Sequence, residues 1–108
     1  MMIFISKYMV PKGFVGITLY PFIFLKRKAL KENKVLINHE KTHLKQQLEL
    51  LIIFFYLFYG IEFLIKLFKY KNAYITYKNL SFEREAYQNE KDFKYLKTRK
   101  QWAFINYL

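Results

Sequence analysis

The chain contains two histidines, His39 and His43, and they stand four residues apart in a stretch whose composition favours a helix. No Gly or Pro occurs between Asn38 and Tyr59, so nothing in that stretch interrupts a helix. Residues four apart lie one above the other on the same helical face. The sequence therefore predicts a helix that presents both imidazoles on one side.

Glu40 lies between the histidines and completes an H-E-x-x-H motif, HEKTH. Two neutral imidazoles in this arrangement can bind one Zn²⁺ ion, and the glutamate can take a proton from a water that the metal polarises. We therefore assign His39 and His43 as zinc ligands and Glu40 as the catalytic base. The competing interpretation is a helix whose His and Glu side chains make ordinary hydrogen bonds in a core.

The same helix predicts which side chains are buried. At 100° per residue, Lys41, Lys45 and Glu49 share one face and are expected to contact water. The buried stripe is predicted to consist of Leu36, Ile37, Leu44, Leu48 and Leu51. Gln46, one turn past His43, lies at the edge of that stripe with the histidines, where it can line the mouth of the site and support its ligands.

Composition limits the ligands and the partners. With 108 residues the chain is predicted to form a single domain, residues 1–108, and it has no cysteine, so His, carboxylate and water must hold any metal. The net charge of +11 favours an anionic membrane surface as a partner. We expect no nucleic-acid partner, because the basic residues are scattered without a stacking motif, and AT-rich codon usage accounts for much of the Lys, Ile, Phe, Tyr and Asn content.

The region before the motif is predicted to form a small sheet. Residues 14–19 and 22–26 are rich in β-branched and aromatic residues and flank Tyr20-Pro21, which interrupts any helix. Residues 1–10 are expected to be a strand or an arm, and they lack the features of a signal peptide. An exposed strand edge here could hold an extended peptide. A plain hydrophobic sheet explains the pattern equally well.

The most apolar run extends from Leu50 to Phe68 and contains Gly60, Glu62 and Lys66. Its length approaches the roughly 20 residues of a membrane span, but two ionisable side chains inside a lipid-exposed helix are costly. Glu62 and Lys66 are four apart and can pair. An interfacial helix is favoured over a core helix, and a core helix over a span, so we expect the protein to be membrane-associated or cytoplasmic.

A catalytic zinc site needs a third protein ligand. Glu49 is excluded because it lies about 15 Å along the helix from His39, at 1.5 Å per residue, and points to the solvent side. Glu62 would require the chain to reverse direction inside the apolar run, which encodes no turn. It remains an alternative metal ligand.

Glu85 is the preferred third ligand. The pattern predicts a helix over residues 82–98, with Ser81 as its N-cap and Glu85 at the edge of its apolar face. Asn89, one turn later, could hydrogen-bond a ligating histidine or Glu85. Glu83 and Glu90 are predicted to project away on the other side.

HEKTH followed by EREAY resembles the gluzincin zinc metallopeptidases, and most of all their small single-domain forms, the minigluzincins. The Glu-Ala pair is also similar to the E-A-D segment of membrane-associated Ste24-like and BlaR1-like peptidases. The resemblance covers roughly residues 14–50 and 79–96 and implies that the glutamate before the alanine, Glu85, is the third ligand. Tyr87 stands where the aspartate of that segment would be. The resemblance also implies a Tyr or His that stabilises the oxyanion, without identifying which tyrosine.

The sequence thus predicts an α+β fold, in which a short β-hairpin or small sheet precedes the H-E-x-x-H helix, a long apolar helix and a C-terminal Glu-bearing helix. The predicted function is zinc-dependent hydrolysis of peptide bonds in a peptide or protein substrate. The alternative is a non-catalytic or latent zinc-binding module associated with a membrane.

Overall fold

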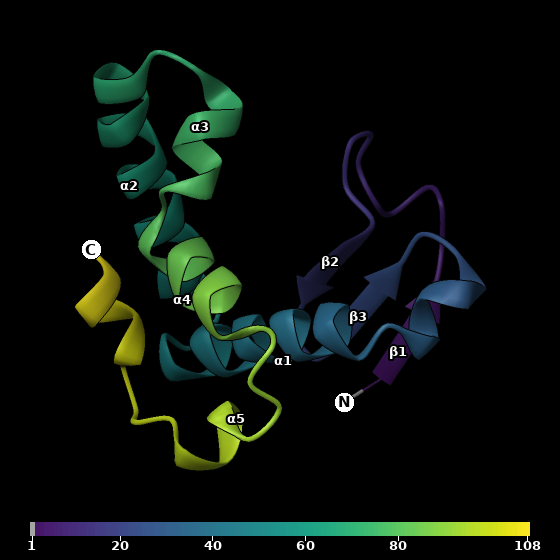
Figure 1. The fold of residues 1–108 in the computed structure, drawn as a ribbon. Helices are drawn as coiled ribbons and strands as arrows, with labels where there is room; N and C mark the ends of the chain where they lie inside the picture. The colour runs from purple at the N-terminus through teal and green to yellow at the C-terminus, as the bar shows by residue number, and fades with distance from the viewer. Residues whose placement is uncertain (1) are drawn as a thin grey trace.

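The computed structural model describes residues 2–108 and confirms the α+β class (Figure 1). The strands are β1 (Met2–Ile5), β2 (Gly16–Leu19) and β3 (Phe22–Leu25). They form one three-stranded sheet in the order β1-β3-β2, with β3 parallel to β1 and antiparallel to β2. The predicted hairpin is confirmed, and β2 is left as an edge strand.

The helical part begins with a 3₁₀ turn and ends with another. The elements are η1 (Lys28–Glu32), α1 (Lys34–Glu49), α2 (Ile53–Tyr70), α3 (Ala73–Lys78), α4 (Ser81–Asn89), α5 (Tyr95–Thr98) and η2 (Ala103–Tyr107). The helices differ from the prediction in two places. A short helix, α3, occupies most of the predicted connector, and the predicted helix over 82–98 is interrupted after Asn89, because residues 90–94 form turns instead.

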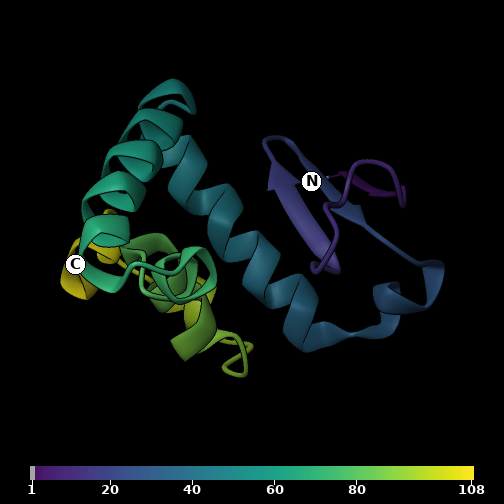
Figure 2. The same ribbon diagram turned by 90° about the horizontal axis from the view of Figure 1, so that it is seen from above.

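Helix α1 is the middle layer of the molecule, with the sheet on one side and α4 on the other (Figure 2). Its buried face is mainly polar, contrary to the predicted leucine stripe. Leu48 and Leu51 are 49% and 70% exposed. The buried residues of α1 are Asn38, His39, Glu40, Thr42, His43, Gln46 and Gln47. Polar side chains are tolerated there because hydrogen bonds satisfy them. Gln47, for example, donates to Thr18 O and accepts from Tyr20 N.

The chain turns sharply between α1 and α2, whose axes differ by 109°. Leu51 and Ile52 form the turn with φ values of 53° and 66°, a region that bulky residues rarely adopt. The apolar sequence gave no sign of this reversal. Among residues 2–108, no single helix has both the length and the apolarity to cross a bilayer; the bent pair of α1 and α2 meets those criteria only when the two are taken together.

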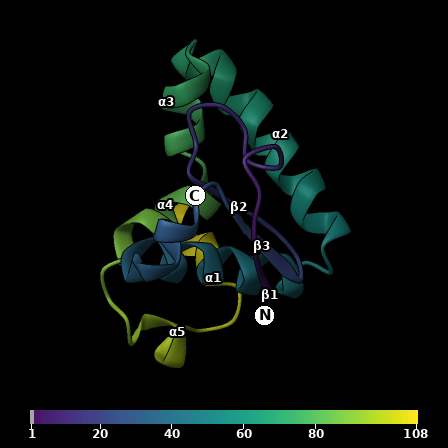
Figure 3. The ribbon, with the colours of Figure 1, turned by 90° about the vertical axis from the view of Figure 1, so that its right-hand side faces the viewer.

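An aromatic cluster packs the helices together. Phe82 of α4 lies against Phe55 of α2 and Phe104 of η2, with ring centroids 4.7 and 4.6 Å apart. On the other side of the molecule, the segment between β1 and β2 reaches α3, where the Phe14 ring lies 5.2 Å from that of Tyr77 (Figure 3). These contacts place α2, α3 and β2 around one end of α1's buried polar face.

Candidate metal centre

Three side chains from two helices converge at this polar face: His39 and His43 of α1 and Glu83 of α4. All three are buried, and their ligand atoms form a nearly regular triangle. His39 Nε2 lies 3.2 Å from His43 Nε2, and Glu83 Oε1 lies 3.3 and 3.1 Å from these two nitrogens. A buried cluster of two imidazoles and a carboxylate is a donor set that zinc prefers.

The size of this triangle fits a tetrahedral zinc ion. Ligands about 2.0–2.1 Å from a tetrahedral centre are separated by roughly 3.3–3.4 Å. The three observed separations lie within about 0.3 Å of that value. His39, His43 and Glu83 could therefore hold the ion with little movement.

Both histidines are oriented by a hydrogen bond at the other ring nitrogen. Nδ1 of His39 lies 3.1 Å from Glu90 Oε2, and Nδ1 of His43 lies 2.8 Å from Gln46 Oε1. Since each partner oxygen is an acceptor, each Nδ1 carries the proton and each Nε2 keeps its lone pair for a metal. Gln46 thus supports the cluster from behind, and Glu90, predicted to project away, does the same for His39.

The amide of Gln46 is itself fixed by two acceptors. Its nitrogen donates to Phe82 O at 3.0 Å and to Glu85 Oε1 at 2.9 Å, which leaves its oxygen facing His43. The orientation of the imidazole therefore depends on α4 through Gln46.

The structure does not bring Glu85, the predicted third ligand, to the histidines; Glu83 occupies that place instead. Its buried carboxylate is hydrogen-bonded to Gln46, to Tyr95 at 2.5 Å and to the guanidinium of Arg99. Arg99 also binds Glu49 of α1 through two hydrogen bonds of 2.8 and 3.1 Å. To bind zinc, the Glu85 carboxylate would therefore have to break these hydrogen bonds.

The other candidates also lie elsewhere. Glu62 accepts hydrogen bonds from Ser81 N and Oγ, both at 2.7 Å, and forms the predicted ion pair with Lys66 at 2.8 Å. It stabilises the start of α4 and makes no contact with the histidines. Asn89 makes the predicted hydrogen bond to Glu85, but to its backbone carbonyl, and also donates to the Tyr107 hydroxyl, so it joins α4 to η2.

The cluster is strongly coupled electrostatically. Burial by itself would lower the pKa of His43, but the charge and hydrogen bond of Glu83, with smaller contributions from Glu40 and Gln46, raise it to about 9. Burial would raise the pKa of Glu83, yet His43 and His39 lower it to about 2. A proton and a divalent cation would therefore compete for the same three side chains.

Glu40 lies beside the cluster and is held by β2. The hydroxyl oxygen of Thr18 is 2.8 Å from Glu40 Oε1 and 3.0 Å from its carbonyl oxygen. Gly16 of the same strand lies next to this carboxylate, since a Cβ at that position would be in ordinary van der Waals contact with Glu40 Oε2, at 3.6 Å. One carboxylate oxygen is thus anchored by Thr18.

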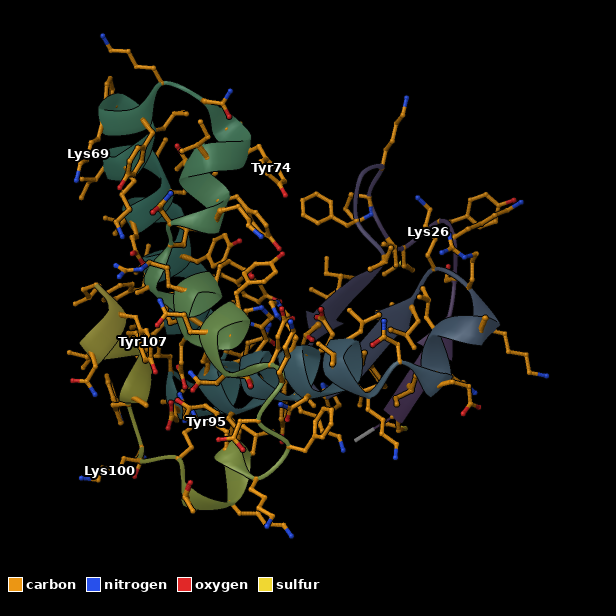
Figure 4. All side chains as sticks on the ribbon, viewed as in Figure 1. Lys26, Lys69, Tyr74, Tyr95, Lys100 and Tyr107 are labelled. Carbon is orange, nitrogen blue, oxygen red and sulfur yellow. The ribbon has the colours of Figure 1, made fainter. Side chains whose placement is uncertain are left out.

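Two cavities of about 250 and 270 Å³ meet at Glu40. They share Phe14, Gly16, Glu40 and Tyr77 as lining residues. The first also contains His43 and Glu83 and is mainly apolar, with Ile17, Leu19, Phe55, Tyr56 and Tyr59. The second contains His39 and opens between α3 and the β1–β2 segment, toward which Tyr74 projects (Figure 4). The cluster therefore lies beside a cleft that extends on both sides of Glu40.

Sequence reasoning missed Glu83 because it assumed that α4 has one buried face. In the fold α4 packs against α1, α3 and η2, so acids two residues apart are both buried but face different neighbours. Glu83 and Tyr87 are four residues apart and share a helical face, and the fold places the Tyr87 ring 4.4 Å from that of His39. This contact joins two helices, so the sequence carried no signal for it.

The chain was compared with protein-family models, with curated proteins and with solved structures, and no match was found.

Proposed function

We propose that the protein is a zinc-dependent peptidase of the gluzincin type, with His39, His43 and Glu83 as ligands. The observation that carries the proposal is the convergence of these three buried side chains beside Glu40 at the wall of a cleft. Bound zinc would supply a Lewis acid that polarises water and the scissile carbonyl.

Glu40 is proposed as the general base. Its carboxylate lines both cavities, and Thr18 holds Oε1, so Oε2 is left to accept a proton from the attacking water. The same carboxyl can then pass that proton to the leaving amine. Glu90 and Gln46 keep both imidazoles in the tautomer that this chemistry needs.

Tyr77 is proposed as the residue that stabilises the oxyanion. Among the tyrosines of residues 2–108 that line the two cavities, it is the one shared by both, and its hydroxyl lies 3.2 Å from that of Tyr87. Burial and the nearby Glu83 charge raise the pKa of Tyr77, so its phenol remains a hydrogen-bond donor at neutral pH.

An extended peptide segment is the proposed substrate, bound along the edge of β2. Gln47 already pairs with Thr18 O and Tyr20 N, as a neighbouring strand would, and covers that end of the edge. The end at Gly16 borders both cavities and is left for main-chain hydrogen bonds with a substrate.

The test is a cleavage assay on a mixed peptide library, together with measurement of zinc content. The parent is expected to bind one zinc per chain and to cleave. Glu40→Gln should keep the zinc and lose at least about 100-fold in kcat, because it removes only the base. Glu32→Gln, an exposed acid on η1, is the matched control and should behave as the parent. Undiminished cleavage by Glu40→Gln would refute the mechanism.

The non-catalytic or latent zinc module is the second candidate, and the +11 charge together with the largely exposed apolar surface of α2 favours a membrane-associated role for it. A non-catalytic module predicts stoichiometric zinc without cleavage by the parent or by chains shortened at the N-terminus, whereas a latent one predicts cleavage by the shortened chains alone. Both candidate functions therefore predict the same zinc content, and the cleavage assay on the parent distinguishes them.

A further inference from the structure

Helix α2 exposes a continuous apolar surface, which we name the outer stripe. Its residues are Ile53, Phe54, Leu57, Ile61, Leu64, Ile65 and Phe68, each more than half exposed. At 100° per residue these positions fall within an arc of about 120°. The end residues are the most exposed, with Ile53 at 75% and Phe68 at 83%.

Part of the remaining surface of α2 packs against the protein. Phe55 and Tyr59 contact Phe82, while Glu62 and Lys66 bind α4 and the residues before it. Phe58, at the edge of the outer stripe, contacts Phe82 and Phe104. A helix that is apolar all round is normally buried on every side. Here one third of the circumference lacks a covering element among residues 2–108.

The charges around the outer stripe are positive. The one acid of α2, Glu62, is buried and paired with Lys66, so it adds no negative charge to the exposed face. Lys69 and Lys71 are exposed at the C-terminal end of the helix, where Lys69 extends outward from the body (Figure 4). An apolar stripe with flanking lysines and exposed aromatic rings is the pattern of a helix that lies in a lipid interface.

A second copy of the chain fits this surface less well. Each copy carries a net charge of +11, so two copies repel one another, whereas anionic lipid headgroups attract both the lysines and the whole molecule. Charge complementarity therefore favours lipid.

We propose that α2 lies in the surface of an anionic membrane, with the outer stripe inserted and Lys69 and Lys71 at the headgroups. The opposite face of α2 contributes Phe55, Tyr56 and Tyr59 to the mainly apolar cavity of the cleft that also contains His43 and Glu83. The cleft is then separated from the lipid by about one helix diameter, roughly 10 Å. This placement does not depend on catalysis or on zinc.

The test is co-sedimentation of the full chain with vesicles of phosphatidylcholine alone and with vesicles that also contain phosphatidylglycerol. The parent should bind the anionic vesicles more tightly and lose part of that binding in high salt. The triple variant Leu57→Gln, Ile61→Gln, Ile65→Gln should bind at least about 30-fold more weakly to both, because it removes inserted apolar surface. A parent that stays in the supernatant with anionic vesicles would overturn the proposal.

A matched control carries the same number of glutamines at exposed apolar positions outside α2: Ile5→Gln, Val15→Gln and Ile105→Gln. It should bind as the parent does, and equal loss in both triple variants would overturn the assignment to α2. The pair Lys69→Gln and Lys71→Asn should reduce the preference for anionic vesicles and leave binding to neutral vesicles unchanged. Circular dichroism checks that each variant is folded.

Two further measurements separate the rival occupants. Sedimentation velocity without lipid should give a monomer, and a dimer that the α2 triple variant abolishes would identify a second copy as the occupant. Because the chain has no cysteine, a spin label can be placed at Ile61→Cys and at Lys45→Cys. The first label should lie about 5–10 Å below the headgroups and the second in water. A label at the bilayer centre would show a span and overturn the proposal.

Discussion

Glu83 and Glu85 lie two residues apart on one short helix, both buried and both ionised, yet their surroundings differ completely. Glu83 faces two imidazoles, whose ring nitrogens are possible metal ligands. Glu85 faces a guanidinium, a phenol and an amide. The first set can exchange a proton for a cation, whereas the second is permanently paired. Burial of a carboxylate therefore does not identify it as a metal ligand. The side chains that surround the carboxylate do.

The two sites are joined through Gln46. This side chain accepts from His43 and donates to Glu85, so the Glu85–Arg99 ion pair helps to orient a histidine of the candidate metal centre. We therefore expect Glu83 to determine whether zinc binds, and Glu85 with Arg99 to determine how stable and how well oriented the site is.

The largest effect is expected from exchanging the two carboxylates for amides separately. Glu83→Gln removes a proposed ligand, so zinc affinity should fall and cleavage should disappear. Loss of a hydrogen bond that only supports a ligand lowers metal affinity by roughly 10–100-fold, and the loss in Glu83→Gln should exceed that. Glu85→Gln should retain zinc in the folded protein. Equilibrium competition with a chromophoric chelator measures both affinities. The reverse order of effects would restore Glu85 as the ligand.

The next effect concerns stability. Arg99→Met leaves the buried carboxylate of Glu85 and the partly buried carboxylate of Glu49 without their cation. It should lower the free energy of unfolding by about 3–5 kcal/mol. Urea unfolding monitored by circular dichroism measures it. Arg27→Met is the matched control, since Arg27 is exposed, and it should change stability by no more than about 0.5 kcal/mol. Similar losses in both variants would mean that the Arg99 network is not a special source of stability.

A smaller effect separates the two sites by pH, in the presence of a chelator. His43 gains its proton more readily in the fold, so its contribution is fully present below the unfolded pKa of 6.5 and is lost as pH rises through about 9. Unfolding free energy should fall by roughly 2–3 kcal/mol over that interval. Glu85 and Arg99 contribute no slope there, because the pKa of Glu85 is lowered and that of Arg99 is raised.

Glu83→Gln provides the control for this titration. It removes the charge that holds the proton on His43, so the pH dependence between 6.5 and 9 should become shallower. A slope that is unchanged in Glu83→Gln would contradict the pairing of His43 with Glu83.

The smallest effect tests the connection between the sites. Gln46→Ala should weaken zinc binding by roughly 10–100-fold, because His43 loses the acceptor at Nδ1. Gln47→Ala is the matched control: the same change, one residue further along α1, at a side chain that holds β2 instead of a histidine. Isothermal titration with zinc measures both variants. Equal losses would point to general loosening of α1 in place of an effect on His43.

Local sequence information was sufficient where spacing alone decides geometry. The helix around His39 and His43, the strands on either side of Tyr20-Pro21 and the Glu62–Lys66 pair all follow from residues within one or two turns of each other. The α+β class follows from the same elements.

Hydrophobic periodicity failed on α1 and α2. It assigned Leu48 and Leu51 to a core, whereas the fold buries Thr42, Gln46 and Gln47. These polar groups are satisfied there: Gln46 bonds to α4, Gln47 to β2, and the Thr42 hydroxyl to the backbone carbonyl of Asn38 within α1. It also gave no sign of the turn at Leu51 and Ile52, where an apolar run adopts positive φ. The turn is stabilised by packing of Leu50 and Phe55 against Phe82, a residue far away in the sequence.

By itself, then, the sequence determined that two imidazoles and a carboxylate share a helix, because a spacing of four residues places side chains on one face. The tertiary structure decided which acid joins them. Glu83 and Glu85 are two residues apart and so project from different sides of α4, and the packing of α4 between α1 and η2 directs Glu83 toward the histidines and Glu85 toward Arg99. That packing results from contacts between residues far apart in the chain, so no local pattern encodes it.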